Sequence, residues 1–326
     1  MLSTTAGLIS RLVTIALLAP AVTTHAQTYP IKPIRLIVPY PPGGGTDAIL
    51  RPIAQSLTQS VGTQFIVDNR GGGATLIGAG IAAKAPPDGY TLLVCGNASH
   101  AISPQLYSHA SYDPFKDFVP ITLLASAPTV LFAHNKLAIA SLAELVEAAK
   151  ANPGKLSYVS SGAGTPPHLS TEIFMSMSGI RLLHVPYKGG GDSLADLIAG
   201  RVDLKFGSAP EAIPPVKAGR LKAIAISLDA RWPDLPNVPT FGESGWPQYK
   251  TGTWYGLCAP AKTPAAIVKR LHAEARDALA SGDLRERLRL LGATPGGNSP
   301  QEFATFIRSE YEQYGKVIKA LNLRAE

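Results

Sequence analysis

The sequence lacks the local motifs that mark most hydrolases, metalloenzymes and nucleoside-triphosphate-dependent enzymes. It contains no G-x-x-x-x-G-K-[ST] phosphate loop, no G-x-S-x-G nucleophile turn and no H-E-x-x-H zinc pair. Its histidines form no i,i+4 pair on a predicted helix, and no Asp/Asn ladder resembles a calcium loop. No catalytic residue, metal site or cofactor is therefore predicted.

Cysteine and charge are also scarce. The chain has 326 residues, of which 16% are charged and two are cysteines, Cys95 and Cys258. Both cysteines lie in apolar segments and show no metal or redox spacing. They could form a disulfide in an exported protein, but two buried apolar side chains are the favoured interpretation. The mild basic excess is scattered, without a Lys/Arg block, so no nucleic-acid partner is expected.

No apolar run is long enough to span a membrane as a helix. The run LVTIALLAPAV follows the basic residue Arg11 and is followed by Thr24-His25-Ala26, with small residues at −3 and −1. This pattern predicts a secretory signal over residues 1–26, with cleavage before Gln27. The mature chain would have a net charge of 29 − 23 = +6 and enough residues for two domains.

Short strand-like runs alternate with helix-like segments, which is typical of the α/β class. Strands are predicted at 34–40, 65–69, 91–95, 155–160, 182–186, 202–206, 221–227 and 253–259. Helices are predicted at 47–60, 75–84, 142–151, 168–178, 193–199 and 210–218, with a helical end over 264–322 and a long loop over 232–248. The apolar run 119–134 is long for one strand and contains Pro128. It suggests a strand that leaves one lobe and enters another.

Three glycine-rich turns join a predicted strand to a predicted helix. They are PPGGGTD (41–47), SSGAGTPPH (160–168) and PYKGGGDS (186–193). Glycine lets a ligand approach the backbone closely, and the N–H groups at a helix N-terminus attract anions. Ligands of open α/β sheets bind beyond the carboxyl ends of the strands, where all three turns would lie. The turns together predict one shared site for a small carboxylate.

The first turn also fits a dinucleotide-binding pattern. Gly43, Gly45 and Ala48 satisfy G-x-G-x-x-A, and Asp68 lies 20 residues beyond Ala48. An exported α/β enzyme that binds a dinucleotide is therefore the alternative hypothesis. Against it, two prolines separate the glycines from the strand, nicotinamide cofactors are scarce outside the cytoplasm, and the other two turns stay unexplained.

The order of the segments resembles the substrate-binding receptors of tripartite tricarboxylate transporters, the Bug family of periplasmic binding proteins. The resemblance rests on YPIKPIRLIVPYPPGGGTD, VDNRGGG with IGAGIAAKAPPDGYTLL, YDPFKDFVPIT, LSYVSSGAGTPPHLS, HVPYKGGG with LADLIAGRVDL, AGRLKAIAIS with PDLPNVPTFGESG, and WYGLCAPAKTPAAIV. It extends from about residue 29 to the C-terminal helices. One departure is GGGATLIGA where family members often carry PGAGGNIGA, so Thr75-Leu76 replaces a Gly-Asn type pair.

The resemblance implies a two-lobe, type II-like periplasmic binding protein, each lobe a mostly parallel sheet flanked by helices. Lobe 1 would comprise residues 27–126 and 250–326, lobe 2 would comprise residues 127–249, and two crossing segments would form the hinge. Such a protein is a monomer and not an enzyme. It captures a small organic carboxylate (a di- or tricarboxylate, an amino acid or an aromatic acid) in the interlobe cleft. It delivers this ligand to the membrane permease of a tripartite tricarboxylate transporter, or to a sensor.

Matched to this chain, the family's carboxylate clamp implies ligand contacts from both lobes, largely through backbone amides, hydroxyls and ordered waters. Lobe 1 would contribute Tyr40, Gly43, Gly44, Gly45, Asp47, Asn97 and Ser99. Lobe 2 would contribute Ser161, Gly162, Thr165, His168, Tyr187, Lys188, Gly189 and Ser208. Two of these have an alternative role at a helix start: Asp47 as a cap and His168 as a hydrogen-bonding residue.

Overall fold

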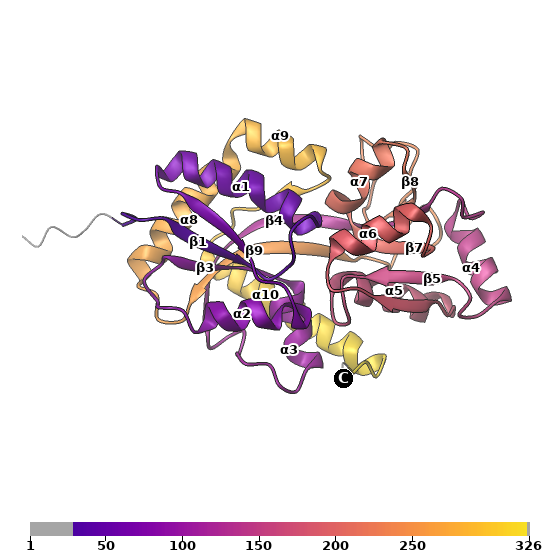
Figure 1. Ribbon diagram of the computed structural model, residues 1–326, viewed down its shortest axis with the longest axis horizontal. Coiled ribbons are helices and arrows are strands. Elements are labelled where there is room, and N and C mark those ends of the chain that lie inside the picture. The colour runs from indigo at the N-terminus through magenta and orange to yellow at the C-terminus, as the bar shows by residue number, and fades with distance from the viewer. Residues whose placement is uncertain (1–28, 325–326) are drawn as a thin grey trace, which may run out of the picture.

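The computed structural model describes residues 29–324, so the predicted signal segment lies outside the described residues. Figure 1 shows two groups of helices, side by side, around strands that continue from one group to the other. The strands form one ten-stranded sheet in the order β2-β1-β3-β9-β4-β7-β5-β6, with β10 and β8 also paired to β4. None of the helices over residues 29–324 has the length and hydropathy needed to cross a membrane.

The first lobe is built on three parallel strands, β1 (Ile34–Val38), β2 (Phe65–Asn69) and β3 (Thr91–Gly96). Leu36 packs in the core beneath α1 (Gly45–Val61), whereas its neighbour Ile37 packs in the core beneath α2 (Leu76–Ala83). Because successive side chains of a strand point to opposite faces, β1 is apolar at every core position. The consecutive buried apolar residues Leu36, Ile37 and Val38 are therefore the pattern of a strand covered on both sides.

Further elements complete this lobe. Short helical segments follow β2 and β3 at Gly73–Thr75, Asn97–Ile102 and α3 (Ser103–Leu106). The C-terminal part contributes α8 (Ala265–Ala280), α9 (Gly282–Leu290), β10 (Thr294–Pro295) and α10 (Pro300–Ala320). The short strand β10 was not predicted; it adds to the sheet edge at β4.

The second lobe repeats the strand–helix alternation. Its strands are β5 (Ser157–Ser160), β6 (Leu183–Pro186), β7 (Leu204–Ser208) and β8 (Leu221–Ile226). Its helices are α4 (Leu142–Ala151), α5 (Pro166–Ser178), α6 (Gly190–Ala199) and α7 (Ala209–Lys217). β5 is parallel to both β6 and β7, while β8 is antiparallel to β4.

The long strand β4 (Phe118–His134) belongs to both lobes, as the length of its apolar run suggested. It pairs with β9 (Gly252–Pro260) as far as Pro128 and with β7 from Thr129 onward. The change of partner occurs at Pro128, which has no N–H to give to a ladder. The return crossing lies alongside, because the Thr129 N–H donates to the Thr251 carbonyl over 3.2 Å. Two adjacent crossings therefore connect the lobes.

Three helices begin two or three residues earlier than predicted, and this changes the site. α1 begins at Gly45, α5 at Pro166 and α6 at Gly190. Proline fits the first turn of a helix because the first N–H groups have no partner inside the helix. Gly45, Pro166, Pro167, Gly190 and Gly191 thus belong to the first helical turns, which brings the helix N-termini to the junction between the lobes.

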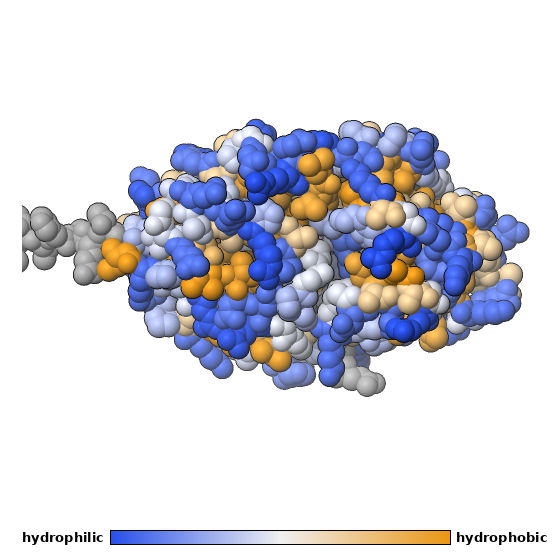
Figure 2. All heavy atoms as spheres, turned by 45° about the horizontal axis from the view of Figure 1, so that its top comes forward, coloured by the Kyte–Doolittle hydropathy of each residue, from blue (hydrophilic) through white to orange (hydrophobic). Residues whose placement is uncertain are grey.

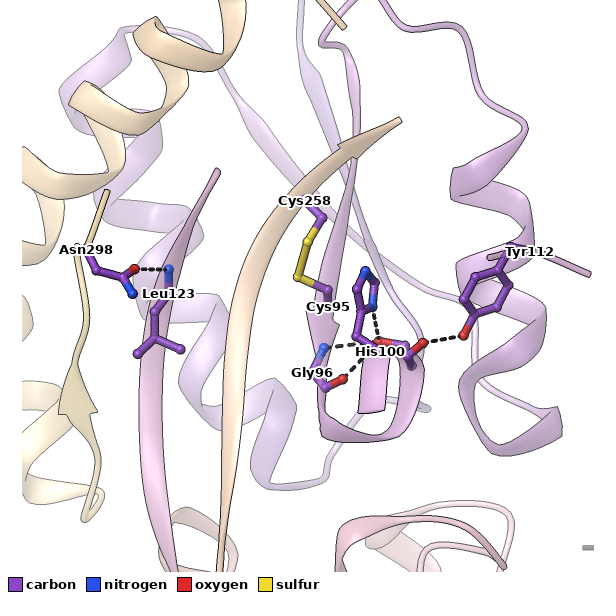
Figure 3. Close-up of a disulfide and its surroundings, with 8 residues drawn as sticks. Cys95, Gly96, His100, Tyr112, Leu123, Cys258 and Asn298 are labelled. Atoms are coloured by element: carbon purple, nitrogen blue, oxygen red, sulfur yellow. Dashed lines mark hydrogen bonds between the residues drawn. A yellow bond between two sulfur atoms is a disulfide. The ribbon is translucent and has the colours of Figure 1, made fainter. Parts of the chain in front are cut away.

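Cys95 and Cys258 form a disulfide, so the favoured interpretation of two unpaired apolar side chains was wrong. Figure 3 shows the bond between β3 and the neighbouring antiparallel strand β9. Their Cα atoms are 6.1 Å apart, and both residues are completely buried. The bond joins β3 to β9, the strand that returns from the second lobe.

Removal of this disulfide should destabilise the protein markedly. The bond closes a loop with a sequence separation of 163 residues, and loss of a native disulfide costs about 2–5 kcal/mol, more for long loops. We expect a Cys95→Ala/Cys258→Ala variant to unfold at a midpoint lower by about 5–15 °C, measured by circular dichroism. Wild type treated with a reductant is the control. A variant with an unchanged melting midpoint would contradict the prediction.

Candidate ligand-binding site between the lobes

Four helix N-termini meet where the two lobes touch. The residues that precede α1, α5, α6 and α7 are Gly44, Thr165, Gly189 and Ser208, and none of the four caps its helix with a side-chain hydrogen bond. Each helix therefore has backbone N–H groups without a side-chain cap, together with the positive end of its dipole. Such groups are suited to an anion.

These N-termini enclose a small space that we call the inner cavity, of about 40 Å³. It is lined by Tyr40, Pro41, Gly44, Gly45, Thr46, Ser161, Thr165, Pro166, Pro167, Gly190, Ser208, Glu211, Thr253 and Tyr255. The volume holds one to three water molecules or one small polar group. Both lobes and the return strand contribute to its wall.

A larger space, the outer cavity, has about 370 Å³. It is lined by Pro39, Tyr40, Pro41, Gly72, Gly73, Ala74, Thr75, Tyr107, Ser161, Gly162, Ala163, Thr165, Tyr187 and Lys188. The two cavities share Tyr40, Pro41, Ser161 and Thr165, so they adjoin. The outer cavity has the volume of a small-molecule site. The two cavities together provide a polar end and a larger space for the rest of a ligand.

The junction between the lobes is made mainly of small residues. Figure 2 shows it as a pale band, the colour of neutral hydropathy, between two regions of mixed blue and orange. A β-carbon added to Gly44 would lie 3.6 Å from the Gly190 Cα, and one added to Gly189 would lie 2.8 Å from the Pro41 ring. The backbones of the two lobes thus come close together at Gly44 and Gly190, and a side chain at Gly189 would collide with the Pro41 ring.

Nine predicted residues border one or both cavities: Tyr40, Gly44, Gly45, Ser161, Gly162, Thr165, Tyr187, Lys188 and Ser208. A tenth, Gly189, precedes α6 and packs on Pro41. Burial raises the pKa of Tyr40, and it raises the pKa of the neighbouring Tyr255 to about 12. Both phenols are therefore uncharged at neutral pH and can donate a hydrogen bond into the inner cavity.

Asn97 and Ser99, predicted to contact ligand, line neither cavity. The Asn97 Oδ1 accepts from the Trp254 N–H over 2.8 Å, and its Nδ2 donates to the Glu310 carboxylate over 3.1 Å. The Ser99 hydroxyl accepts from the backbone N–H of Gly96 over 3.0 Å. Both side chains are buried inside the first lobe. They hold the turn after β3 in place, and their side chains lie outside the two cavities.

Asp47 and Gly43 also line neither cavity. The Asp47 carboxylate accepts from the Arg51 guanidinium over 2.6 Å and from the Asn69 amide over 3.2 Å. The Gly43 N–H points to the same carboxylate, at 3.4 Å. Asp47 therefore stabilises the turn and the start of α1, which is the alternative role. Gly43 has φ +86°, a backbone conformation that favours glycine.

His168 supports the outer cavity from behind, again in its alternative role. Its Nδ1 accepts from the Gly164 N–H over 3.2 Å, and its ring stacks on His184 with centroids 4.4 Å apart. His184 in turn bonds to the Ser160 hydroxyl over 2.7 Å, and that hydroxyl accepts from the Gly162 N–H. Burial lowers the pKa of both histidines to about 4. Two neutral imidazoles thus fix the turn at residues 162–164.

A buried histidine in the first lobe should make the stability depend on pH. Burial lowers the pKa of His100 to about 3, whereas an unfolded histidine titrates near 6.5. Below pH 6.5, His100 becomes protonated in the unfolded chain but stays neutral in the folded protein, so lowering the pH favours unfolding. We expect wild type to lose about 3 kcal/mol more than His100→Leu between pH 7 and pH 4, measured by urea unfolding. Parallel pH profiles for the two proteins would contradict this.

Sequence reasoning missed Glu211, Thr253 and Tyr255 in the inner cavity, and Tyr107 in the outer one. Glu211 lies three residues after the predicted Ser208, in a fourth strand-to-helix turn, FGSAPE. This turn has no glycine run, which explains why it was not recognised. The position itself, between a strand and a helix, was the available signal.

The residues of the dinucleotide pattern have other partners. The Asp68 carboxylate accepts from Arg35 over 2.5 Å and from Arg70 over 2.9 Å. These two arginines lower the pKa of Asp68, although burial opposes them. This acid is engaged by two arginines, and Gly43 lines neither cavity. The geometry gives the alternative hypothesis no support.

Comparison with known families decides the identity. Residues 49–323 match the family described as "Tripartite tricarboxylate transporter family receptor". The chain belongs to this family. The receptor is also 34% identical over 300 residues to Protein BugT of Bordetella pertussis, covering 92% of each chain. The predicted family is therefore confirmed.

Solved structures confirm the fold of the receptor. An R. palustris protein solved with adipate is 37% identical, with a TM-score of 0.88, covering 91% of this chain and 99% of that one. MatC from Rhodopseudomonas palustris, solved with bound malate, is 30% identical, with a TM-score of 0.84, covering 89% of this chain and 100% of that one. The periplasmic binding protein BugD is 32% identical, with a TM-score of 0.86, covering 91% of this chain and 100% of that one, so the predicted two-lobe periplasmic binding protein fold is shown.

Proposed function

We propose that this receptor binds a small organic carboxylate between its lobes and delivers it to the membrane permease of a tripartite tricarboxylate transporter. The observation that carries the proposal is the convergence of four uncapped helix N-termini on one cavity lined by both lobes. Two similar proteins were solved with the dicarboxylates adipate and malate, which supports the same ligand class here. The proposed mode of binding requires no metal and no cofactor.

The energies are sufficient for such a ligand without a buried arginine. Each helix N-terminus contributes about 0.3–1 kcal/mol toward an anion, and each charge-assisted hydrogen bond about 1.5–3 kcal/mol. Micromolar affinity needs about 8 kcal/mol. Three or four backbone N–H bonds from different helices supply this amount. Lys188 at the outer cavity is a candidate partner for a second carboxylate.

We further propose that ligand closes the lobes about the paired crossings at Pro128–Thr129 and Thr251–Gly252. The proposed lobes are residues 27–126 with 250–326, and residues 127–249. Ligand that contacts both lobes would stabilise the closed arrangement over the open one. We also propose that the receptor is a monomer in the periplasm and that its signal segment is cleaved before Gln27. Mass spectrometry of the exported protein would measure the cleavage site.

A thermal-shift screen of the mature protein tests the proposed function. It should include mono-, di- and tricarboxylates, amino acids and aromatic acids, with NAD as the control ligand. We expect stabilisation by at least one carboxylate, followed by micromolar binding in calorimetry and compaction in small-angle scattering. Stabilisation by NAD and by no organic acid would reverse the proposal in favour of the dinucleotide hypothesis.

A further inference from the structure

A buried ion pair lies directly behind the inner cavity. The Lys205 ammonium on β7 is completely buried and donates to the Glu211 Oε1 over 2.5 Å and to the Ser193 hydroxyl over 2.8 Å. Glu211 is 7% exposed and is the acidic residue in the wall of the inner cavity. A buried ion pair often contributes little to stability compared with apolar residues of the same size. The pair therefore suggests a role in the site.

Two glycines leave room for the Glu211 carboxylate. A β-carbon on Gly190 would lie 3.0 Å from its Oε1, and one on Gly207 would lie 2.8 Å from its Oε2. Within residues 29–324, Lys205 is the hydrogen-bond partner found for this carboxylate, and it binds only Oε1. Oε2 thus keeps its capacity to accept a hydrogen bond, and the residue that carries it lines the inner cavity.

A carboxylate in this position selects what can enter. It accepts hydrogen bonds and donates none. A ligand that displaces water from the inner cavity without bringing a donor would leave a buried acceptor unsatisfied, which is costly. A carboxylate ligand is still allowed, since Lys205 balances the charge of Glu211. The inner cavity therefore favours a hydrogen-bond donor adjacent to the ligand's carboxylate.

The surrounding charges indicate a neutral donor. The four helix N-termini present positive partial charge to this region, and the negative charge of Glu211 is already offset by Lys205. A ligand ammonium would be repelled by the helix N-termini, whereas a hydroxyl would not. The inner cavity, at about 40 Å³, also accommodates a hydroxyl beside a carboxylate end.

We infer that the ligand is a hydroxy-substituted carboxylate whose hydroxyl donates to Glu211, with Lys205 as a positioning residue for that carboxylate. The inference rests on the proposed function and narrows its ligand class. The carboxylate end of the ligand binds the helix N-termini, the hydroxyl binds Glu211, and the rest of the molecule extends into the outer cavity.

Matched pairs of acids test the inference in calorimetry on the wild-type protein. The pairs differ by one hydroxyl: succinate and malate, glutarate and 2-hydroxyglutarate, propionate and lactate, phenylacetate and mandelate. For the pairs that bind, we expect the hydroxy acid to bind about 10- to 100-fold more tightly, the equivalent of one charge-assisted hydrogen bond. Aspartate, the amino counterpart of malate, should bind more weakly than malate.

A double variant, Lys205→Met/Glu211→Met, locates the source of the preference. It removes both charges and keeps similar volumes, so folding should survive. We expect the preference for the hydroxy acid to fall to about threefold or less. The matched control is Asp283→Met/Arg287→Met, which removes an exposed ion pair on α9, outside both cavities, and should leave the preference unchanged.

Each outcome has one meaning. Equal binding of both members of every pair would overturn the inference and leave the proposed function intact. Tighter binding of aspartate than of malate would overturn the inference that the ligand's hydrogen-bond donor is uncharged. A folded double variant that keeps the preference would overturn the role of Glu211. Binding of no acid in any series would contradict the proposed function itself, and the inference with it.

Discussion

Gly45→Val should weaken ligand binding by about 100-fold or more. A β-carbon at Gly45 would lie 2.7 Å from the Ser208 hydroxyl and 3.2 Å from the Glu211 Cβ, across the junction between the lobes. Valine adds two further methyl groups, so the lobes cannot approach to their present distance. Ligand would then bind one lobe only and lose at least two charge-assisted hydrogen bonds, about 3–6 kcal/mol. Closure, and not the fold, is the property affected.

Calorimetry and small-angle scattering of the same samples measure this effect. The titrant is the carboxylate that binds wild type most tightly in the screen. Gly282→Val is the matched control, because Gly282 also begins a helix, α9, lines neither cavity, and an added β-carbon there would have nothing within 4 Å. We expect the control to bind the ligand and become more compact, as wild type does, and we expect the Gly45→Val protein to keep its lobes open when ligand is added. A Gly45→Val protein that binds and compacts normally would show that the lobes need not touch.

The fold was largely predictable because its signals are local. Each strand or helix is indicated by the residue pattern of a short segment, and the length of the apolar run 119–134 predicted β4. What local patterns could not give was the pairing of distant segments. The disulfide shows this, since Cys95 and Cys258 become neighbours only when β9 returns from the second lobe beside β3. The apolar surroundings of both cysteines fit a free and a paired state equally well.

The site was predictable where backbone chemistry determines it. Glycine turns at a helix start indicate free N–H groups, and residues such as Gly44, Gly45 and Gly162 do border the cavities. Side-chain direction is a different matter. Asn97 follows a strand end in the expected place, yet its amide points inward to Trp254 and Glu310. Which way such a side chain points depends on packing across the lobe, and sequence alone does not contain it.

Glu211→Met alone should destabilise the receptor more than the double variant Lys205→Met/Glu211→Met. Among the described residues, the single change leaves the completely buried Lys205 with the Ser193 hydroxyl as its remaining hydrogen-bond partner. Breaking a buried pair from one side costs about 3–5 kcal/mol, whereas replacing both members with apolar residues is often neutral. For a chain of this length, we expect the single variant to melt roughly 6–15 °C below wild type.

Urea unfolding and thermal melts of wild type and both variants measure the difference. Lys205→Met/Glu211→Met should recover most of the stability lost in the single variant, and it serves as the control for the loss of the Glu211 side chain itself. Equal melting midpoints for the single and double variants would show that Lys205 tolerates the loss of its partner. Stability recovered in the double variant together with a lost preference for hydroxy acids would separate the two roles of the pair. The ion pair is then retained for ligand selection, since the fold does not require it.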